Sequence, residues 1–193
     1  MKRSILCLAA TLAFTVAGSA DAAPWRVLPG STLGFSSSFE GEAFEGSFAK
    51  FTPVIEFDPK QLAGARFDVT IMLASADTRN DERDEALRGT GFFNSRTTPQ
   101  ARFLATKFRA LGGNRYVADG ALTLNGINKP VALEFTWTPG AKTVLAGSAA
   151  VKRLDFKVGT GEWSDTAELP NAVKVRTRLL LAAPTGTPAA KKP

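Results

Sequence analysis

The feature that most constrains this fold is a strict alternation of apolar and polar residues in short segments. In residues 66–74, Phe67, Val69 and Ile71 share one parity, and residues 129–137 repeat the pattern. A period of two is that of a β-strand with one buried face. We expect strands over eight segments, which are 33–39, 44–57, 66–74, 101–110, 116–124, 129–137, 143–154 and 173–181.

Turn residues between these segments indicate how the strands connect. Asn125-Gly126 is a strong signal for a two-residue hairpin, and Gly112-Gly113-Asn114 marks another turn. Segment 44–57 is too long for one flat strand, and Gly46 and Pro53 predict a sharp bend or bulge within it. Eight short strands in a chain of 193 residues favour a single all-β domain, an antiparallel up-and-down β-barrel.

Residues 75–99 interrupt the strand pattern once. Thr78 and Asp81 have capping-box spacing, Asp84 and Arg88 lie one helical turn apart, and Gly89 is a natural stop. The pattern predicts a short helix over residues 79–88.

This helix has too little apolar surface to bury a stripe of its own. Ala86 and Leu87 are its only apolar residues, so we expect it to lie over the barrel. Phe92 and Phe93 follow immediately and are the plug that such a lid would carry.

The N-terminal end of the chain predicts export, and the C-terminal end predicts a disordered tail. Residues 1–22 resemble a secretory signal, with Lys2 and Arg3 before an apolar run and Ala20-Asp21-Ala22 as the cleavage site. We therefore expect a signal peptide over 1–22, a barrel domain over 23–182, and a disordered Pro/Ala-rich tail over 183–193.

Composition excludes several functions. The chain has no His, and its one Cys, Cys7, lies in the expected signal. The sequence therefore lacks the residues for the usual metal sites, for Ser-His and Cys-His catalytic pairs and for covalent haem attachment. The 24 Lys and Arg residues are interspersed with 18 Asp and Glu residues, for a net charge of +6, which does not favour nucleic-acid binding. We expect no metal, no cofactor and no catalytic residue.

The acidic residues of the predicted helix leave one catalytic alternative open. Asp81, Glu82, Asp84 and Glu85 could serve acid–base chemistry, as in a hydrolase or isomerase. Carboxylates interleaved with arginines on a short helix are more often a solvated, self-paired face.

Phenylalanine is the informative residue for the interior. The chain has 14 Phe and one Tyr, which suits a dry interior. Composition leaves open whether the barrel is filled by its own side chains or hollow. Strand parity and the lid predict these lumen residues: Phe35, Phe39, Phe51, Ile55, Phe67, Val69, Ile71, Leu73, Phe92, Phe93, Phe135 and Trp137.

Four stretches carry a resemblance to a known family. D-T-R-N-D-E-R-D-E-A-L-R-G-T-G-F-F from Asp77 is similar to the signature of the YceI-like family of periplasmic lipocalin-like proteins. Three others agree in order, namely F-E-G-S-F-A-K-F-T-P-V-I-E-F-D-P from Phe44, D-G-A-L-T-L-N-G-I-N-K-P-V from Asp119 and R-L-D-F-K-V-G-T-G-E-W from Arg153.

The resemblance implies a lipocalin-like, non-catalytic periplasmic barrel that holds a polyisoprenoid or another long-chain amphiphilic lipid, such as a quinone, in its lumen. It also implies a structural signature of Thr78, Arg83, Asp84, Leu87 and Gly126. Within it we expect Asp84 to face Arg88, and Arg83 to face a loop carbonyl or an acid. The rival interpretation is a solid barrel that serves as an interaction module or stress-response protein without a lipid.

Two stretches bear on partners. Gly30-Ser31 stands where the family commonly has His-Ser, so any role of that histidine is absent or replaced. V-G-T-G-E-W-S-D from Val158 is similar to a family subset found with membrane cytochromes of the diheme b type, which implies a quinone-linked redox partner. The sequence leaves monomer and homodimer open.

Overall fold

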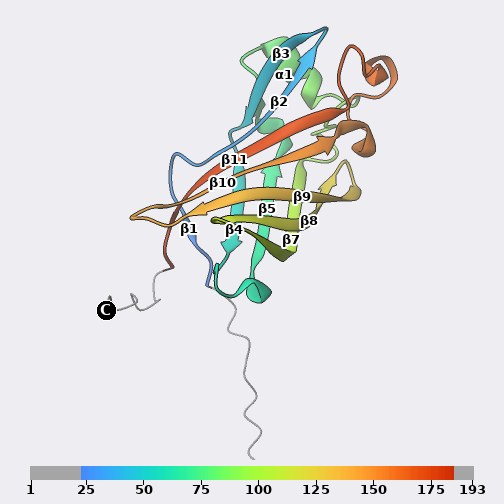
Figure 1. Cartoon of the computed structure of the whole chain (residues 1–193). Helices are drawn as coiled ribbons and strands as arrows, with labels where there is room; N and C mark the ends of the chain where they lie inside the picture. The colour runs from blue at the N-terminus through green and yellow to red at the C-terminus, as the bar shows by residue number, and fades with distance from the viewer. Residues whose placement is uncertain (1–22, 185–193) are drawn as a thin grey trace, which may run out of the picture.

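The structure is a computed structural model that describes residues 23–184, which are mostly β-strand with one short α-helix (Figure 1). The predicted signal peptide and most of the predicted tail, residues 1–22 and 185–193, lie outside the described residues.

Seven strands lie across the sheet in the same order as along the chain, each antiparallel to the next, with only the short β6 (Ala76–Asp77) of the chain omitted from the series. They are β4 (Phe51–Glu56), β5 (Arg66–Met72), β7 (Gln100–Gly112), β8 (Arg115–Leu124), β9 (Ile127–Thr138), β10 (Thr143–Lys152) and β11 (Ala172–Ala182). The β8–β9 turn has Asn125 at φ 49° and Gly126 at φ 73°, the left-handed pair that a tight hairpin requires.

An extra residue in β7 changes its parity. Ala105 pairs with Gly120 and Lys107 with Asp119, so Thr106 is a β-bulge. The bulge lets Ala105 and Phe108 both reach the interior, although they are three residues apart.

The N-terminal hairpin completes the sheet from the far end of the chain. Strand β2 (Thr32–Phe39) pairs with β11, β3 (Glu42–Phe48) pairs with β2, and the short β6 (Ala76–Asp77) pairs with β3. The single bent strand predicted for 44–57 is wrong: the segment breaks at residues 49–50 into β3, which pairs with β2, and β4 at the opposite edge of the sheet, and Gly46 and Pro53 are paired within these two strands.

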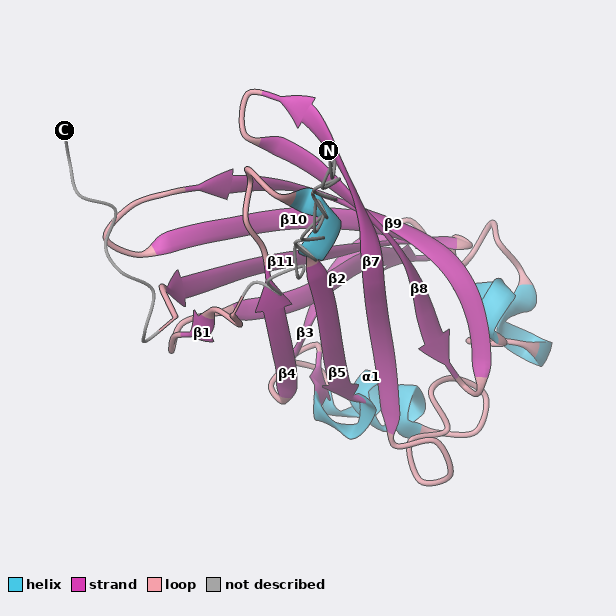
Figure 2. Ribbon diagram, turned by 90° about the horizontal axis from the view of Figure 1, so that it is seen from below, coloured by secondary structure: helices cyan, strands magenta, loops and turns pink. Residues whose placement is uncertain are grey.

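Residues 25–27 connect the edge strand β4 to β11, an inner strand of the sheet. Strand β1 (Arg26–Val27) pairs with β11, while Trp25 forms a bridge to Ile55 of β4 and its indole N–H donates to the Phe57 carbonyl at 2.9 Å. The strands form a strongly curled antiparallel sheet, a half-barrel (Figure 2). Residues 25–27 link its strands β4 and β11.

The predicted all-β barrel with one short helix is confirmed, with small differences in its elements. Eleven strands replace the expected eight because 44–57 divides in two and the short β1 and β6 are added. Helix α1 (Asp81–Arg88) begins two residues later than predicted. Four 3-10 turns complete the described chain, which are η1 (Leu62–Gly64), η2 (Leu73–Ser75), η3 (Arg153–Phe156) and η4 (Gly161–Ser164).

Candidate functional site

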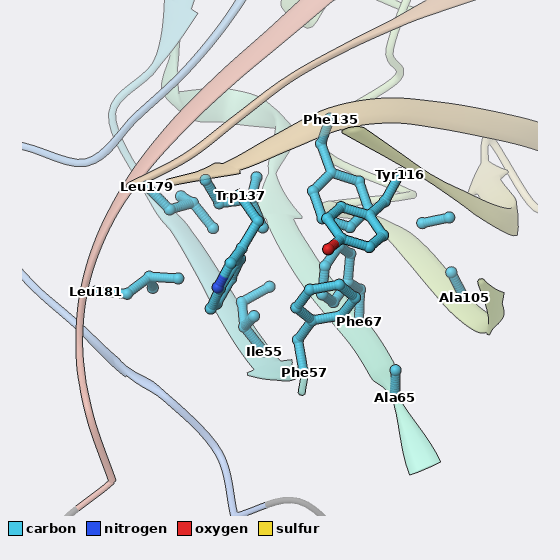
Figure 3. Packing of buried hydrophobic residues seen from close by; sticks show 12 residues of the cluster. Ile55, Phe57, Ala65, Phe67, Ala105, Tyr116, Phe135, Trp137, Leu179 and Leu181 are labelled. Carbon is cyan, nitrogen blue, oxygen red and sulfur yellow. The ribbon is translucent and has the colours of Figure 1, made fainter. Parts of the chain in front are cut away.

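Inward-facing residues at one end of the barrel form a solid aromatic cluster, which we call the packed end. Figure 3 shows the rings of Phe57, Phe67, Tyr116, Phe135 and Trp137, and the ring of Phe108 packs against them. The Phe57 ring, just after β4, lies 4.8–5.9 Å from each of the other five ring centres. This end has no room for a ligand.

The other half of the interior, which we call the hollow end, contains a cavity of about 190 Å³. Apart from Ser37, Arg153 and Thr177, every residue that lines it is apolar. The wall comes from the inner face of strands β2 to β5 and β7 to β11 and from α1. The cavity is therefore the lumen of the barrel rather than a surface groove. Its side chains include Phe35, Phe44, Phe48, Phe51, Val69, Ile71, Leu87, Phe92, Phe93, Phe103, Val131 and Val175.

Two glycines keep large rings against the wall. A Cβ on Gly120 would lie 2.7 Å from the ring of Phe103, and a Cβ on Gly46 would collide with the ring of Phe35. Both rings line the cavity while covering a glycine of the neighbouring strand. The absence of these two Cβ atoms therefore lets the rings lie flat and leaves the lumen open.

Arg153 is a buried cation at the cavity wall, with a residue exposure of 3%. Its guanidinium donates five hydrogen bonds, all to backbone carbonyls, those of Val158, Gly159, Trp163, Leu169 and Pro170. Five is the full donor capacity of the side chain. Burial lowers the pKa of Arg153, yet an arginine stays charged at neutral pH. Arg153 thus organises the segment 153–171 and has no N–H left for a ligand.

Helix α1 and residues 89–99 and 153–171 cover the hollow end, and we call them the cover. Leu87 of α1 and Phe92 and Phe93 after it line the cavity. Phe92 also contacts Trp163 of the second segment at 5.6 Å between ring centres. The lid role that the sequence predicts for the helix agrees with this placement.

The contacts of Asp84 differ from those predicted. The capping box is wrong, because Asn80 is the N-cap residue and accepts from the Arg83 N–H at 2.9 Å. The Asp84 carboxylate is buried and accepts from the N–H and the hydroxyl of Thr78, at 2.8 and 2.7 Å. Arg88 pairs instead with Glu85 at 3.3 Å. Asp84 therefore fixes the approach to the helix rather than its end.

Arg83 was expected to reach a carbonyl or an acid, and the structure places it elsewhere. Its guanidinium lies over the ring of Phe44, 4.5 Å from the ring centre, in a cation–π contact. Because Phe44 lines the cavity, Arg83 supports a lumen wall from the helix.

Asn125 fastens the two segments of the cover to the barrel. Its amide donates to the Phe92 carbonyl at 2.8 Å and to the Phe156 carbonyl at 3.2 Å, and its oxygen accepts from the Thr98 hydroxyl. Gly126 beside it has a positive φ and an exposed position, so its part in the predicted signature is the turn itself. The sequence marked Asn125 as a turn residue but gave no sign of these contacts.

The structure places nine of the twelve predicted lumen residues at the cavity wall. They are Phe35, Phe51, Ile55, Phe67, Val69, Ile71, Leu73, Phe92 and Phe93. Phe135 and Trp137 face inward but lie in the packed end, and Phe39 contacts Trp163 outside the cavity. Strand parity thus identified the inner face, but it carries no information on height along the barrel.

Several lining residues were missed, although their segments carry the same alternation. Leu122 and Leu124 of β8, and Val173 and Val175 of β11, are spaced by two and face the cavity. Small residues differ in their placement: Ser37 lines the cavity, whereas Ala118 lies in the packed end and Ala146 in an outer groove.

The described residues offer little machinery for catalysis or metal binding. Within 23–184 there is no group of three or more His, Cys, Asp or Glu side chains placed to hold a metal. On α1, Asp81, Glu82 and Glu85 are exposed. None of the helices in this part of the chain has the length and apolarity needed to cross a membrane.

Sequence comparison places this geometry in a family. The model of the YceI-like domain matches residues 25–181. A UPF0312 protein of Photorhabdus laumondii is 34% identical over 182 residues, which cover 88% of this chain and 94% of the relative. Protein YceI of Escherichia coli is 38% identical over 173 residues, covering 83% and 89%.

Solved structures agree with the fold. The crystal structure of Burkholderia cenocepacia BcnA is similar with a TM-score of 0.76 and 32% identity, over 79% of this chain and 96% of the other. A polyisoprenoid-binding domain from Saccharophagus degradans shares the fold with a TM-score of 0.63 at 19% identity, over 83% and 98%. The chain belongs to the YceI-like family.

Proposed function

We propose that this protein is a non-catalytic binding protein that holds the apolar chain of a polyisoprenoid lipid in its lumen. The observation that carries the proposal is the apolar cavity of about 190 Å³ beneath the cover. An apolar cavity of ~150 Å³ in another protein stays dry and binds benzene, so this one has both the size and the chemistry for a hydrocarbon.

Apolar burial supplies the driving force. Each buried CH₂ contributes about 0.8 kcal/mol, so one five-carbon prenyl unit contributes about 4 kcal/mol before the entropic cost of binding. Three or four enclosed units contribute about 12–16 kcal/mol, which leaves the about 8 kcal/mol of micromolar binding after an entropic cost of about 4–8 kcal/mol. The family relationship supports an isoprenoid, since a domain of the same fold is described as polyisoprenoid-binding.

The finer parts of the proposal concern the headgroup, location and partner. A quinone-type lipid, a periplasmic location after removal of residues 1–22, and a diheme cytochrome b as membrane partner agree with the sequence features described above. N-terminal mass analysis of the protein recovered from the periplasm checks export, and recovery of a chain that retains Met1 or Lys2 contradicts it.

Mass spectrometry of an organic extract tests the function. Protein purified from its native host should release a prenyl lipid in a stoichiometric amount, and the Ile71→Trp variant, with its lumen filled, should release far less. A folded parent protein with no extractable lipid and no binding of added prenyl lipids supports the solid interaction module and ends the proposal. Turnover lost in Asp84→Asn with folding intact would instead indicate an enzyme.

A further inference from the structure

Ser37 is a polar residue at the wall of the apolar cavity. It lies on β2, with Phe35 on the same inner parity and Phe44 opposite it on β3. In the described part of the chain, its hydroxyl is the one buried side-chain oxygen or nitrogen with no hydrogen-bond partner. Buried hydroxyls are nearly always paired, so this one calls for a partner.

The two other polar residues of the wall are already engaged. Thr177 donates its hydroxyl to the Thr32 carbonyl at 3.1 Å. Arg153 uses all five of its N–H groups on backbone carbonyls. Ser37 is therefore the lining side chain whose hydrogen-bonding capacity is wholly free for a bound molecule.

We infer that Ser37 selects lipids that carry one uncharged oxygen, a hydroxyl or a carbonyl, at the end of the apolar chain. The inference rests on the proposed function and adds a specificity residue to it. A hydroxyl can donate to a carbonyl and can also accept from an alcohol, so either oxygen completes the hydrogen bonding of Ser37.

The same inventory disfavours a charged group inside the lumen. A phosphate needs several donors to replace its lost hydration, and the wall offers one free hydroxyl, that of Ser37, besides Arg153 and Thr177, which already donate to backbone carbonyls. A phosphorylated lipid must therefore keep its phosphates outside the cavity.

The position of Ser37 also gives an orientation. Phe39, the next residue of the same parity on β2, contacts Trp163 of the cover, whereas Leu33, four residues back from Ser37, lies toward the packed end. The oxygen of the ligand would thus lie beneath the cover, with the prenyl chain running toward Phe67.

Binding of three C20 probes to delipidated protein tests the inference, with dissociation constants from calorimetric titration. The probes are geranylgeraniol, the hydrocarbon of the same chain without oxygen, and geranylgeranyl diphosphate. The variants are Ser37→Ala, Ser37→Thr, which keeps a hydroxyl, and Ser36→Ala, the neighbour of opposite parity that the cavity does not include.

Ser37→Ala should weaken geranylgeraniol binding by roughly three- to tenfold, the size of one net hydrogen bond, and leave the hydrocarbon and the diphosphate unchanged. Ser37→Thr and Ser36→Ala should keep the preference of the parent for the alcohol. Because Ser37→Ala removes an unpaired hydroxyl, its thermal midpoint without ligand should be equal to or above that of the parent.

Other outcomes overturn the inference. An equal change for all three probes, a loss confined to the diphosphate, or a lower thermal midpoint of lipid-free Ser37→Ala each contradict the assigned role while leaving the lipid-binding function standing. Failure of the parent to bind any of the three probes overturns the proposed function, and the role of Ser37 with it.

Discussion

The packed end and the hollow end are built by the same strands from the same kinds of residue, yet one is solid and the other is open. On β9, Phe135 belongs to the packed end while Val131 and Leu133 line the cavity. At the packed end, Phe57 enters from outside the strands and contacts rings on several of them. At the hollow end, Phe35 and Phe103 lie flat on glycines instead of reaching across.

The difference teaches that the inner face of a barrel does not by itself decide whether the barrel is filled. What decides it is whether a ring crosses the lumen, as Phe57 does, or lies along the wall, as Phe103 does. Stability should therefore depend on the packed end and ligand binding on the hollow end, and the following changes test that division.

The largest effect should come from Phe57→Ala. Phe57 is 1% exposed and contacts five other rings, so its removal should lower the free energy of unfolding by about 3–5 kcal/mol. Urea unfolding measures the loss. The matched control is Phe51→Ala at the cavity wall, where the ring already borders empty space and the cost should be less than half as large. Equal losses would remove the distinction between the two ends.

Larger side chains should also destabilise the packed end more than the hollow end. Ala118→Leu in the packed end, where Ala118 is fully buried, should cost about 1–3 kcal/mol through overpacking. Ile71→Trp at the cavity wall should cost much less, because the larger ring enters open space, while it displaces lipid. Thermal unfolding and lipid extraction on the same samples give both results. A severe loss of stability in Ile71→Trp, with no lipid in the parent, would mean that the lumen is effectively solid.

Arg153→Lys should loosen the cover without disturbing the packed end. A lysine ammonium has three N–H groups on one atom and cannot reach all five carbonyls, so the unfolding free energy should fall by about 1–2 kcal/mol. Hydrogen exchange should speed up within residues 153–171 and stay unchanged in β8 and β9 around Phe135. Faster exchange spread evenly over the barrel would contradict a role confined to the cover.

The smallest effect should come from a charge cluster on the outer face, which belongs to neither end. Hydrogen bonds from Arg102, and then from Arg66, lower the pKa of Asp68 from 3.8 to about 2. The ionised carboxylate thus stabilises the fold above pH 4, and this contribution is lost as the pH falls from 4 to 2.

Asp68→Asn should accordingly lower the unfolding free energy by less than about 1 kcal/mol at pH 7, because the arginines are exposed, and by much less near pH 2, where about half of the Asp68 carboxylate is protonated. Urea midpoints from pH 2 to pH 7 measure this, with exposed Glu42→Gln as the control. A difference between variant and parent that keeps its full size at pH 2 would show that the cluster acts through packing instead.

The sequence predicted the strands well because alternation reports directly which side of a strand is buried. It placed Val69 and Ile71 at the interior, and the structure agrees. It failed for Phe135 and Trp137 because height along a barrel depends on strand tilt and register, which no local pattern encodes. It also missed the bulge at Thr106, which changes the parity of Phe108.

The polar contacts were the least predictable part. Asp84 was assigned to Arg88 by helical spacing, but Thr78, outside the helix, provides two better donors. The stretch that begins at Arg153 carries part of the family resemblance, but the sequence gave no sign of the contacts of Arg153, since its partners are backbone carbonyls, which every residue has. Such contacts depend on the path of a loop, and that path follows from the tertiary fold.

The pairing of β2 with β11 has a consequence for the order in which the chain folds. Thr32 lies opposite Arg178, and the Ser31 hydroxyl accepts from the Leu180 N–H, a contact between residues 149 positions apart. The β4–β11 meander can form from neighbours, but in the first hairpin, which pairs with β6 through β3, the other side of β2 has no partner until the last strand has emerged. Loop closure over such a distance is slow, so joining of these two strands should limit the rate of folding. Until then, β2 and β11 each present an unpaired edge, and this interval is when the chain is most exposed to aggregation and to proteases.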